Sequence, residues 1–154
     1  KRQFSLAGNK LMIVKQISSV LLFFICFNCY AQTSKVILVI EDVNAKKGGD
    51  VLTGIFIEEN FLKIGRQTYG KAVAVNASTM EILYENIPAG DYAFVAFQDF
   101  DRNNKLKTNF VGYPKEPVGF SNNAKIVFGP PSFDDAKIRI AAGMVVRIKI
   151  KLNK

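Results

Sequence analysis

The sequence has 154 residues, a formal net charge of +8, 49% hydrophobic residues and 22% charged residues. This length suits one domain, and the balance of apolar to charged residues excludes an intrinsically disordered chain. The sequence contains no His, which excludes a Ser-His-Asp or Cys-His catalytic site within it.

The N-terminal segment is predicted to lie outside the fold. Residues 1–11 precede Met12 and form an upstream extension. In residues 12–31, Lys15 precedes the apolar run Ile17–Phe27, which is the order of charge and hydrophobicity in a secretory signal peptide. The run is shorter than the roughly 20 residues of a membrane-spanning helix, so we predict a signal peptide over residues 12–31.

The end of that segment contains both cysteines of the sequence. Cys29 and Ala31 are small residues at the two positions that a signal peptidase requires, which predicts cleavage before Gln32. Acylation at Cys26 or Cys29, giving a lipid anchor, is the alternative, but the residues before them are not the small ones that such a site prefers. We expect the mature chain, residues 32–154, to be exported to the periplasm or outside the cell. It has no disulfide, cysteine-ligated zinc or transmembrane helix.

The first part of the mature chain consists of short apolar runs separated by turn residues, which predicts strands and no long helix. The first run is apolar at nearly every position and predicts a central strand. "NAKKGGD" after it has two glycines and predicts a turn. The expected strands are residues 35–43, 51–59, 71–77, 79–87 and 91–99.

The C-terminal stretch "DAKIRIAAGMVVRIKIKL" alternates apolar and basic residues, which predicts a β-hairpin with its turn at Ala141–Gly143. We expect the basic face to be solvated rather than bound to an anionic polymer or lipid. Removal of residues 1–31 takes away four basic residues and no acid, so the net charge falls from +8 to +4. That balance does not indicate a nucleic-acid partner. About seven strands in one domain predict an all-β fold, an antiparallel β-sandwich over residues 32–154.

A long loop, residues 99–135, interrupts the strand pattern. Loops of this length are uncommon unless they are functional or disordered, and the density of aromatic residues argues for a structured loop. We expect its Phe residues to form a small satellite core, and we leave Tyr113 open between packing and ligand contact. The aromatic residues are Phe100, Phe110, Tyr113, Phe120, Phe128 and Phe133.

Motifs of this loop carry a family resemblance. They are Gly112-x-Pro114-Lys115-Glu116, Gly119-Phe120-Ser121-Asn122-Asn123 and Phe128-Gly129-Pro130-Pro131-x-Phe133. With the preceding "DFDRNNKLKTN" they resemble the bacterial domain of unknown function 2141 family. The resemblance implies an exported domain with a transthyretin-like or carbohydrate-binding-like sandwich, and it implies no activity. The chain departs from that family at Gln98, where His is usual, and at Lys107, where Asp is usual.

The start of the loop has the spacing of half a calcium loop. Asp99, Asp101 and Asn103 place oxygens at alternate positions, and Asn104 stands where a positive φ is needed. Phe110 replaces the closing bidentate Glu, and three cations lie nearby, which weakens the site. The alternative, which we prefer, is a set of Asx-turns. The three cations are Arg102, Lys105 and Lys107.

We expect a non-enzymatic binding or interaction module that uses this loop, with a glycan or a protein of the cell envelope as partner and with calcium as the one candidate cofactor. The alternatives are a calcium-supported carbohydrate-binding domain and a carboxylate-dependent hydrolase. The hydrolase would use Asp99 and Asp101, with Glu116, Asp134 and Asp135 as further carboxylates. The ligand-binding candidates are Asp99, Asp101, Asn103, Asn109, Tyr113, Asn122 and Asn123.

Overall fold

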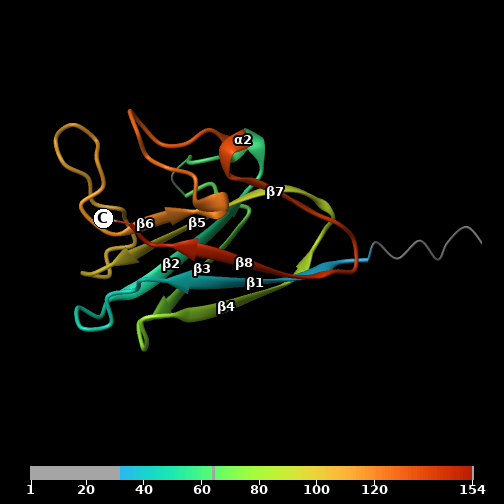
Figure 1. Ribbon diagram of the computed structural model, residues 1–154, viewed down its shortest axis with the longest axis horizontal. Coiled ribbons are helices and arrows are strands. Elements are labelled where there is room, and N and C mark those ends of the chain that lie inside the picture. Colours follow the sequence, from blue (N-terminus) through green and yellow to red (C-terminus); the bar gives the residue numbers. More distant parts are fainter. Residues whose placement is uncertain (1–31, 64, 154) are drawn as a thin grey trace, which may run out of the picture. The chain divides into compact units, whose positions relative to one another are not determined.

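The structure is a computed structural model that describes residues 32–63 and 65–153. The predicted extension and signal peptide lie outside these residues. The described part contains eight strands in two sheets, together with a few short helical turns (Figure 1). The all-β prediction is therefore confirmed. No helix among the described residues is long and apolar enough to cross a membrane.

The first sheet has three strands in the order β4-β1-β8. Its central strand is β1 (Ser34–Glu41), as predicted from its apolar sequence. β1 pairs antiparallel with β4 (Met80–Ile87) and parallel with β8 (Val145–Lys151). Because β1 has a neighbour on both sides, its backbone hydrogen-bonding groups are satisfied on both edges.

The second sheet is built around β5 (Gly90–Asp99), its longest strand. One edge of β5 pairs with β2 (Asp50–Phe56), and β2 pairs in turn with β3 (Tyr69–Ala74). Two short strands share the other edge of β5. These are β7 (Lys137–Ile140), which pairs near its start, and β6 (Val118–Phe120), which pairs near its end.

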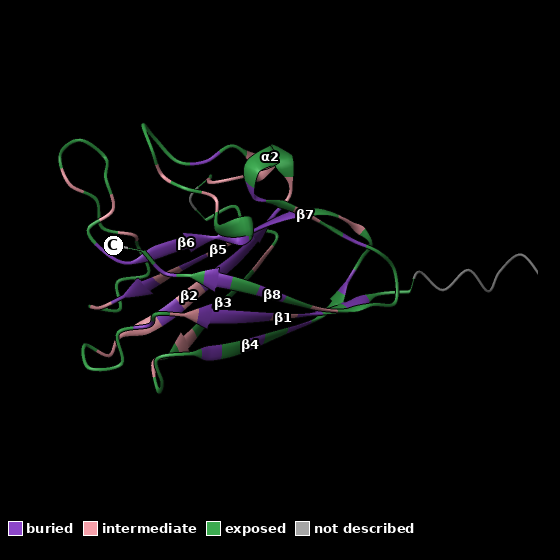
Figure 2. Ribbon diagram, in the orientation of Figure 1, coloured by how far each residue is buried: buried purple, intermediate pink, exposed green. Residues whose placement is uncertain are grey.

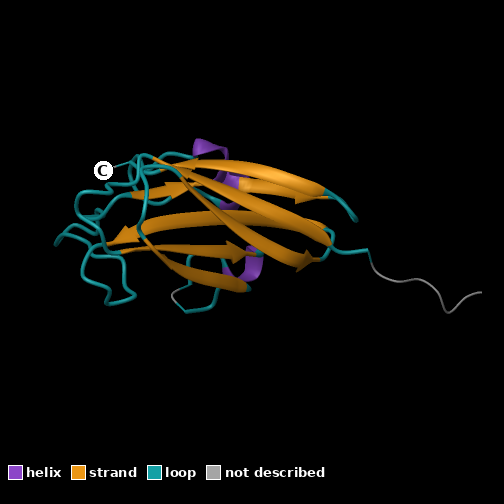
Figure 3. Ribbon diagram, turned by 90° about the horizontal axis from the view of Figure 1, so that it is seen from below, coloured by secondary structure: helices purple, strands orange, loops and turns teal. Residues whose placement is uncertain are grey.

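The main core lies between the two sheets, which are seen as layers in Figure 3. β1 contributes Val36, Leu38 and Ile40 to it, and β5 contributes Phe94 and Ala96. Both sets follow the two-residue period of a strand, which places alternate side chains on one face of a sheet.

A second apolar cluster covers the opposite face of β5, and we call it the satellite cluster. It explains why β5 is apolar on both faces, since each face contacts a separate layer. Phe61, from the segment after the 3₁₀ turn η1 (Glu58–Asn60), packs edge-on against Phe133 of the helix α2 (Phe133–Ala136), with ring centroids 5.7 Å apart. The buried members of the satellite cluster are Ala93, Val118, Phe120 and Ala136.

The predicted C-terminal hairpin is wrong. β7 and β8 are consecutive strands, but β7 pairs with β5 in one sheet and β8 pairs with β1 in the other. The alternation of apolar and basic residues predicts which residues face inward, but it does not predict which strand β7 or β8 pairs with. The basic side chains are exposed as expected, but on two different sheets, and each forms an ion pair with an acid. These pairs are Lys137–Asp134, Arg139–Asp91, Arg147–Glu81, Lys149–Glu41 and Lys151–Asp42.

β6 is the strand that the sequence did not predict. It also joins the two sheets, because Val118 and Asn153 exchange two backbone hydrogen bonds of 3.0 Å beyond the end of β8. Gly119 makes this approach feasible, since a Cβ there would lie 2.3 Å from the Lys151 carbonyl oxygen. β6 therefore anchors the middle of the long loop to both layers. The long loops gather at one end of the sandwich (Figure 3).

Candidate functional site

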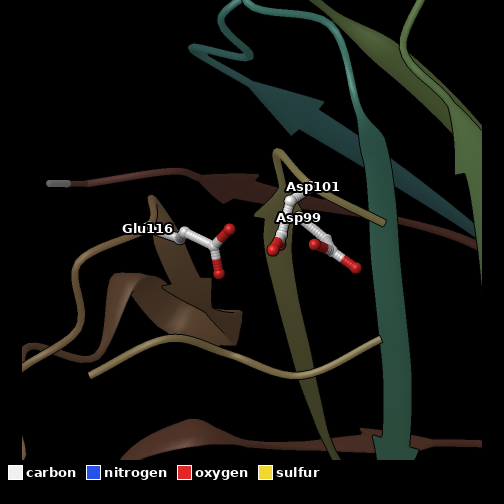
Figure 4. A group of neighbouring side chains, drawn as sticks. All are labelled: Asp99, Asp101 and Glu116. Carbon is white, nitrogen blue, oxygen red and sulfur yellow. The ribbon is translucent and has the colours of Figure 1, made fainter. Parts of the chain in front are cut away.

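Three carboxylates meet where the long loop leaves β5. Asp99 is the last residue of β5, Asp101 follows it in the loop, and Glu116 comes shortly before β6. One oxygen from each side chain lies within 4.8 Å of the others. Figure 4 shows Glu116 reaching toward the two aspartates from the side of β6. We call Asp99, Asp101 and Glu116 the acidic cluster; Asp99 and Glu116 are buried, and Asp101 is exposed.

The loop turns sharply just after Asp99. Arg102 and Asn104 adopt left-handed φ angles of 58° and 59°. Asn tolerates a positive φ better than most residues, and the expected positive φ at Asn104 is present. The turn brings the Asn104 N–H to Asp99 Oδ2, to which it donates a hydrogen bond of 2.6 Å.

Asn103 lies beside the acidic cluster and does not contribute its oxygen to it. Asn103 Oδ1 accepts a hydrogen bond of 2.8 Å from the Lys105 N–H, which is an Asx-turn. Asn103 Nδ2 donates to both carboxylate oxygens of Asp101, at 2.8 and 2.9 Å. In place of Asn103, the structure brings Glu116 to the two aspartates. As a site residue, Glu116 belongs only to the hydrolase alternative among the sequence-based hypotheses, because no local spacing links it to Asp99.

Glu116 closes the base of the loop. Its Oε1 accepts a hydrogen bond of 3.0 Å from the Phe100 N–H, and its Oε2 accepts one of 3.0 Å from the Lys107 N–H. Asp99 differs, because its Oδ1 is buried and has no hydrogen-bond partner among the described residues. Buried polar atoms in folded proteins are nearly always paired, so this oxygen calls for an explanation.

Within the described part of the chain, one cation contacts the acidic cluster. Lys107 Nζ lies 2.6 Å from Asp101 Oδ2. The hydrogen bond from Lys107 holds the pKa of Asp101 below its ordinary value, and the same contact raises the pKa of Lys107. Arg102 instead pairs with Asp50 at 3.1 Å. The third nearby cation, Lys105, forms no ion pair within the described part of the chain.

The remaining predicted asparagines have different roles. Asn109 Oδ1 accepts hydrogen bonds from the N–H groups of Val111 and Tyr113, at 3.1 and 2.8 Å, and so holds a tight turn. Asn122 Nδ2 donates to the Lys137 carbonyl oxygen at 3.0 Å, which ties the 3₁₀ turn η2 (Ser121–Asn123) to β7. Asn123 lines a surface groove beside Tyr113.

Residues 107–116 and 124–132 form two loops that line a common groove, and both are drawn largely in green, as exposed, in Figure 2. Both loops carry exposed apolar side chains. We call them the two-loop surface. Phe110 and Phe128 are fully exposed, at 100% and 105% of their reference areas. The members of the two-loop surface are Phe110, Val111, Tyr113, Val127 and Phe128.

Hydrogen bonds hold the first of these loops in a narrow hairpin-like shape. The Lys115 N–H donates to the Lys107 carbonyl oxygen at 2.7 Å, and the Asn109 N–H donates to the Tyr113 carbonyl oxygen at 2.8 Å. Phe110 lies at the tip of this hairpin. Its exposure therefore belongs to an ordered loop, whose base is closed by Glu116.

A groove of about 420 Å³ runs between the two loops. Its walls include Val111 and Tyr113 from the first loop and Val127 and Phe128 from the second, and its floor includes Phe120 of β6. A second groove of about 390 Å³ shares Tyr113 and Phe120 with the first and is more polar, with Asn123, Lys125 and Lys151 among its lining residues. Tyr113 thus lines both an apolar groove and a basic one.

The aromatic residues of the loop divide into two groups. Phe120 is buried in the satellite cluster and Phe133 packs against it, as expected. The expected packing fails at Phe110 and Phe128, which are fully exposed. Phe100 is also outside the satellite cluster; it is half-buried, with Lys47 Nζ 4.8 Å from its ring centroid. Phe110 and Phe128 each lie within two residues of a glycine, in "NFVG" and "VFGP", which indicates a turn, but the buried Phe120 directly follows Gly119, so this signal alone does not separate the two groups. A side chain at the tip of a turn points away from the core.

The chain matches a known protein family. The sequence pattern of a family described as an uncharacterized protein conserved in bacteria (DUF2141) matches residues 38–148. No curated protein matches the chain significantly, and no solved structure does. The matched range contains both loops and the whole acidic cluster.

Proposed function

Since the chain belongs to the DUF2141 family of bacteria, whose description names no activity, we propose from its own surface that it is an exported, non-enzymatic binding module. Its binding site is the two-loop surface. Export is supported by the signal-peptide pattern of residues 12–31 in the sequence. The partner is a protein of the cell envelope that presents apolar side chains flanked by acidic groups.

The observation behind this proposal is the complete exposure of Phe110 and Phe128 on two neighbouring loops, the first of which is held by hydrogen bonds across it. Single exposed apolar residues are common, whereas a cluster of them around a groove is typical of interaction sites. Burial of one Phe side chain on binding is worth about 1.5–3 kcal/mol. Such anchors in the middle of an interface supply much of its affinity.

Charge around the two-loop surface indicates the second property of the partner. Lys115 lies at the base of the first loop and Lys125 in the second, and both are exposed. Neither forms an ion pair within residues 32–63 and 65–153. Unpaired cations at the rim of an apolar site favour acidic partners and increase the rate of association.

The two alternatives have less support. A glycan site needs a flat aromatic face among hydrogen-bonding groups, and Tyr113 beside the basic groove is the residue that offers one. A hydrolase needs carboxylates that face a cleft, and none of the acidic cluster lines either of the two grooves described above. In addition, both oxygens of Glu116 accept backbone hydrogen bonds.

Selection from a random peptide display library tests the proposal, with the purified protein as bait. We expect enrichment of peptides that combine apolar and acidic residues. Isothermal titration calorimetry on a selected peptide then measures Kd for the wild type and for the double variant Phe110→Ser/Phe128→Ser. The loss of two anchors should weaken binding by at least about tenfold.

The matched control removes exposed apolar side chains elsewhere. Met144 and Val145 are 51% and 65% exposed, at the end of β8 far from the loops. The variant Met144→Ser/Val145→Ser should bind like the wild type. Equal binding by wild type and the loop variant would refute the assigned surface. A glycan site would instead give no enriched peptide and a glycan-array signal that Tyr113→Ala removes.

A further inference from the structure

We propose that the acidic cluster is a binding site for a hard divalent cation, Ca²⁺ in particular, at the base of the first loop. Its protein ligands are carboxylate oxygens of Asp99, Asp101 and Glu116. This inference does not depend on the function proposed for the two-loop surface. The ligand set also differs from the sequence-based one, because Glu116 replaces Asn103.

The unpaired oxygen of Asp99 is the first reason. Asp99 is fully buried, and its Oδ1 has no hydrogen-bond partner among the described residues. An ionised carboxylate only accepts hydrogen bonds, so an unpaired oxygen in a buried position is costly. A cation coordinated by Oδ1 would satisfy this oxygen.

The spacing of the carboxylates is the second reason. One oxygen from each lies within 4.8 Å of the other two. Ca²⁺ binds oxygens at about 2.3–2.6 Å, so two ligands on opposite sides of one ion are about 4.6–5.2 Å apart. All three oxygens therefore fit around a single ion without a change in the backbone. Asp101 is exposed and leaves one side open to water ligands.

The hydrogen bonds of the cluster are compatible with a bound ion. Each oxygen of Glu116 accepts one backbone hydrogen bond, and a carboxylate oxygen has a second lone pair free for a metal. Backbone and side-chain hydrogen bonds of this kind hold the ligands of metal sites in position.

Charge balance is the third reason, and it also sets the affinity. The cluster contains three carboxylates, and Lys107 is the one cation among the described residues that contacts it, at 2.6 Å from Asp101 Oδ2. The Lys107 ammonium neutralises part of the negative charge of the cluster, and it must move aside when Ca²⁺ binds. We therefore expect a dissociation constant near the millimolar range of extracellular calcium modules.

A bound ion would stabilise the loop. Asp99 ends β5, Asp101 begins the loop, and Glu116 ends it. One cation held by all three would fasten both ends of residues 100–117 to the sheet. It would thereby fix the hairpin whose tip bears Phe110.

The test measures Ca²⁺ binding by calorimetry and the melting temperature in 10 mM CaCl₂ or excess chelator. We expect the wild type to melt about 5 °C higher with Ca²⁺. Asp101→Asn and Glu116→Gln should each abolish the shift, and Asp101, being exposed, can be replaced without disturbing the core. The matched control is Glu81→Gln, which removes an exposed carboxylate of β4 and should keep the full shift.

Lys107→Gln is the most discriminating variant, because it removes the ammonium that competes with Ca²⁺ for Asp101. It should tighten Ca²⁺ binding by roughly tenfold or more. Absence of both binding heat and a melting shift in the wild type would overturn the proposal, and so would equal Ca²⁺ responses of wild type and Asp101→Asn. Peptide binding by the two-loop surface is a separate readout, so failure of one proposal leaves the other testable.

Discussion

Replacement of Gln98 by Ala is expected to cost about 3 kcal/mol of unfolding free energy. Gln98 lies in β5 and is fully buried. Its Oε1 accepts a hydrogen bond of 2.8 Å from the Asn44 N–H, and its Nε2 donates to the carbonyl oxygens of Asn44 and Gly48, at 3.0 and 2.7 Å. Each such bond contributes about 1 kcal/mol net, and its loss leaves polar groups of the turn before β2 unpaired.

The variant Gln98→Glu tests the direction of these bonds with almost no change in shape. It replaces the Nε2 donor by an oxygen that faces two carbonyl oxygens. Burial and this repulsion favour the neutral form, so the pKa of the introduced carboxyl should be raised. The variant should therefore be least stable at neutral pH and should regain stability as the pH falls through that raised pKa.

Urea denaturation followed by far-UV circular dichroism, at neutral and at mildly acidic pH, measures these effects. Gln67→Ala is the matched control, because Gln67 is exposed and is expected to change stability by less than about 0.5 kcal/mol. If Gln98→Ala were as stable as that control, the three hydrogen bonds would not be what holds the turn. A Gln98→Glu variant whose stability did not rise on acidification would refute the assigned donor.

Three further predictions concern the loops and their anchors. In urea denaturation, Phe110→Ser should leave the free energy of unfolding within about 0.5 kcal/mol of wild type, whereas Phe120→Ala should lower it by about 3–5 kcal/mol. The reason is that Phe110 is 100% exposed and Phe120 is 5% exposed. Equal costs for the two variants would contradict this difference in burial. Gly119→Ala should lower the melting temperature, because its Cβ would lie 2.3 Å from the Lys151 carbonyl oxygen at the end of β8. An unchanged melting temperature would contradict this close approach. Hydrogen bonds from the Ser132 hydroxyl and N–H lower the pKa of Asp135. The Asp135 carboxylate therefore stabilises the fold above its pKa in the unfolded chain, and this stabilisation is lost as the pH falls through its pKa in the folded protein. The stability difference between wild type and Asp135→Asn should therefore shrink from about pH 5 to pH 2, and a constant difference would count against it.

Local patterns predicted most strands of this fold but not all of their partners. The period-two alternation correctly identified β5 and β8 and the inward faces of both. It could not show that β8 pairs parallel with β1, because pairing depends on the global arrangement of the sheets. β6 has three residues, "VGF", which is too short for any periodicity to be recognised.

The candidate site was predictable only in part, for a similar reason. The spacing of Asp99 and Asp101 drew attention to the right turn, and the expected Asx-turn is present at Asn103. Glu116 could not be assigned, because only the return of the chain toward β6 brings it to the aspartates. Likewise, the composition of the loop predicted aromatic packing, while the individual fates of Phe110 and Phe120 depend on whether each lies at a tip or in a strand.

The most direct test of the central claim, that the two-loop surface binds a partner, is hydrogen exchange of the protein in the presence of a peptide selected from the display library. Amide exchange is measured by mass spectrometry for the free protein and for the protein with saturating peptide. We predict that protection gained on binding falls on residues 107–116 and 124–132 together, and that the end of β8 near Val145 is unchanged. Protection confined to other segments, or to one loop alone, would contradict a binding site formed by both loops.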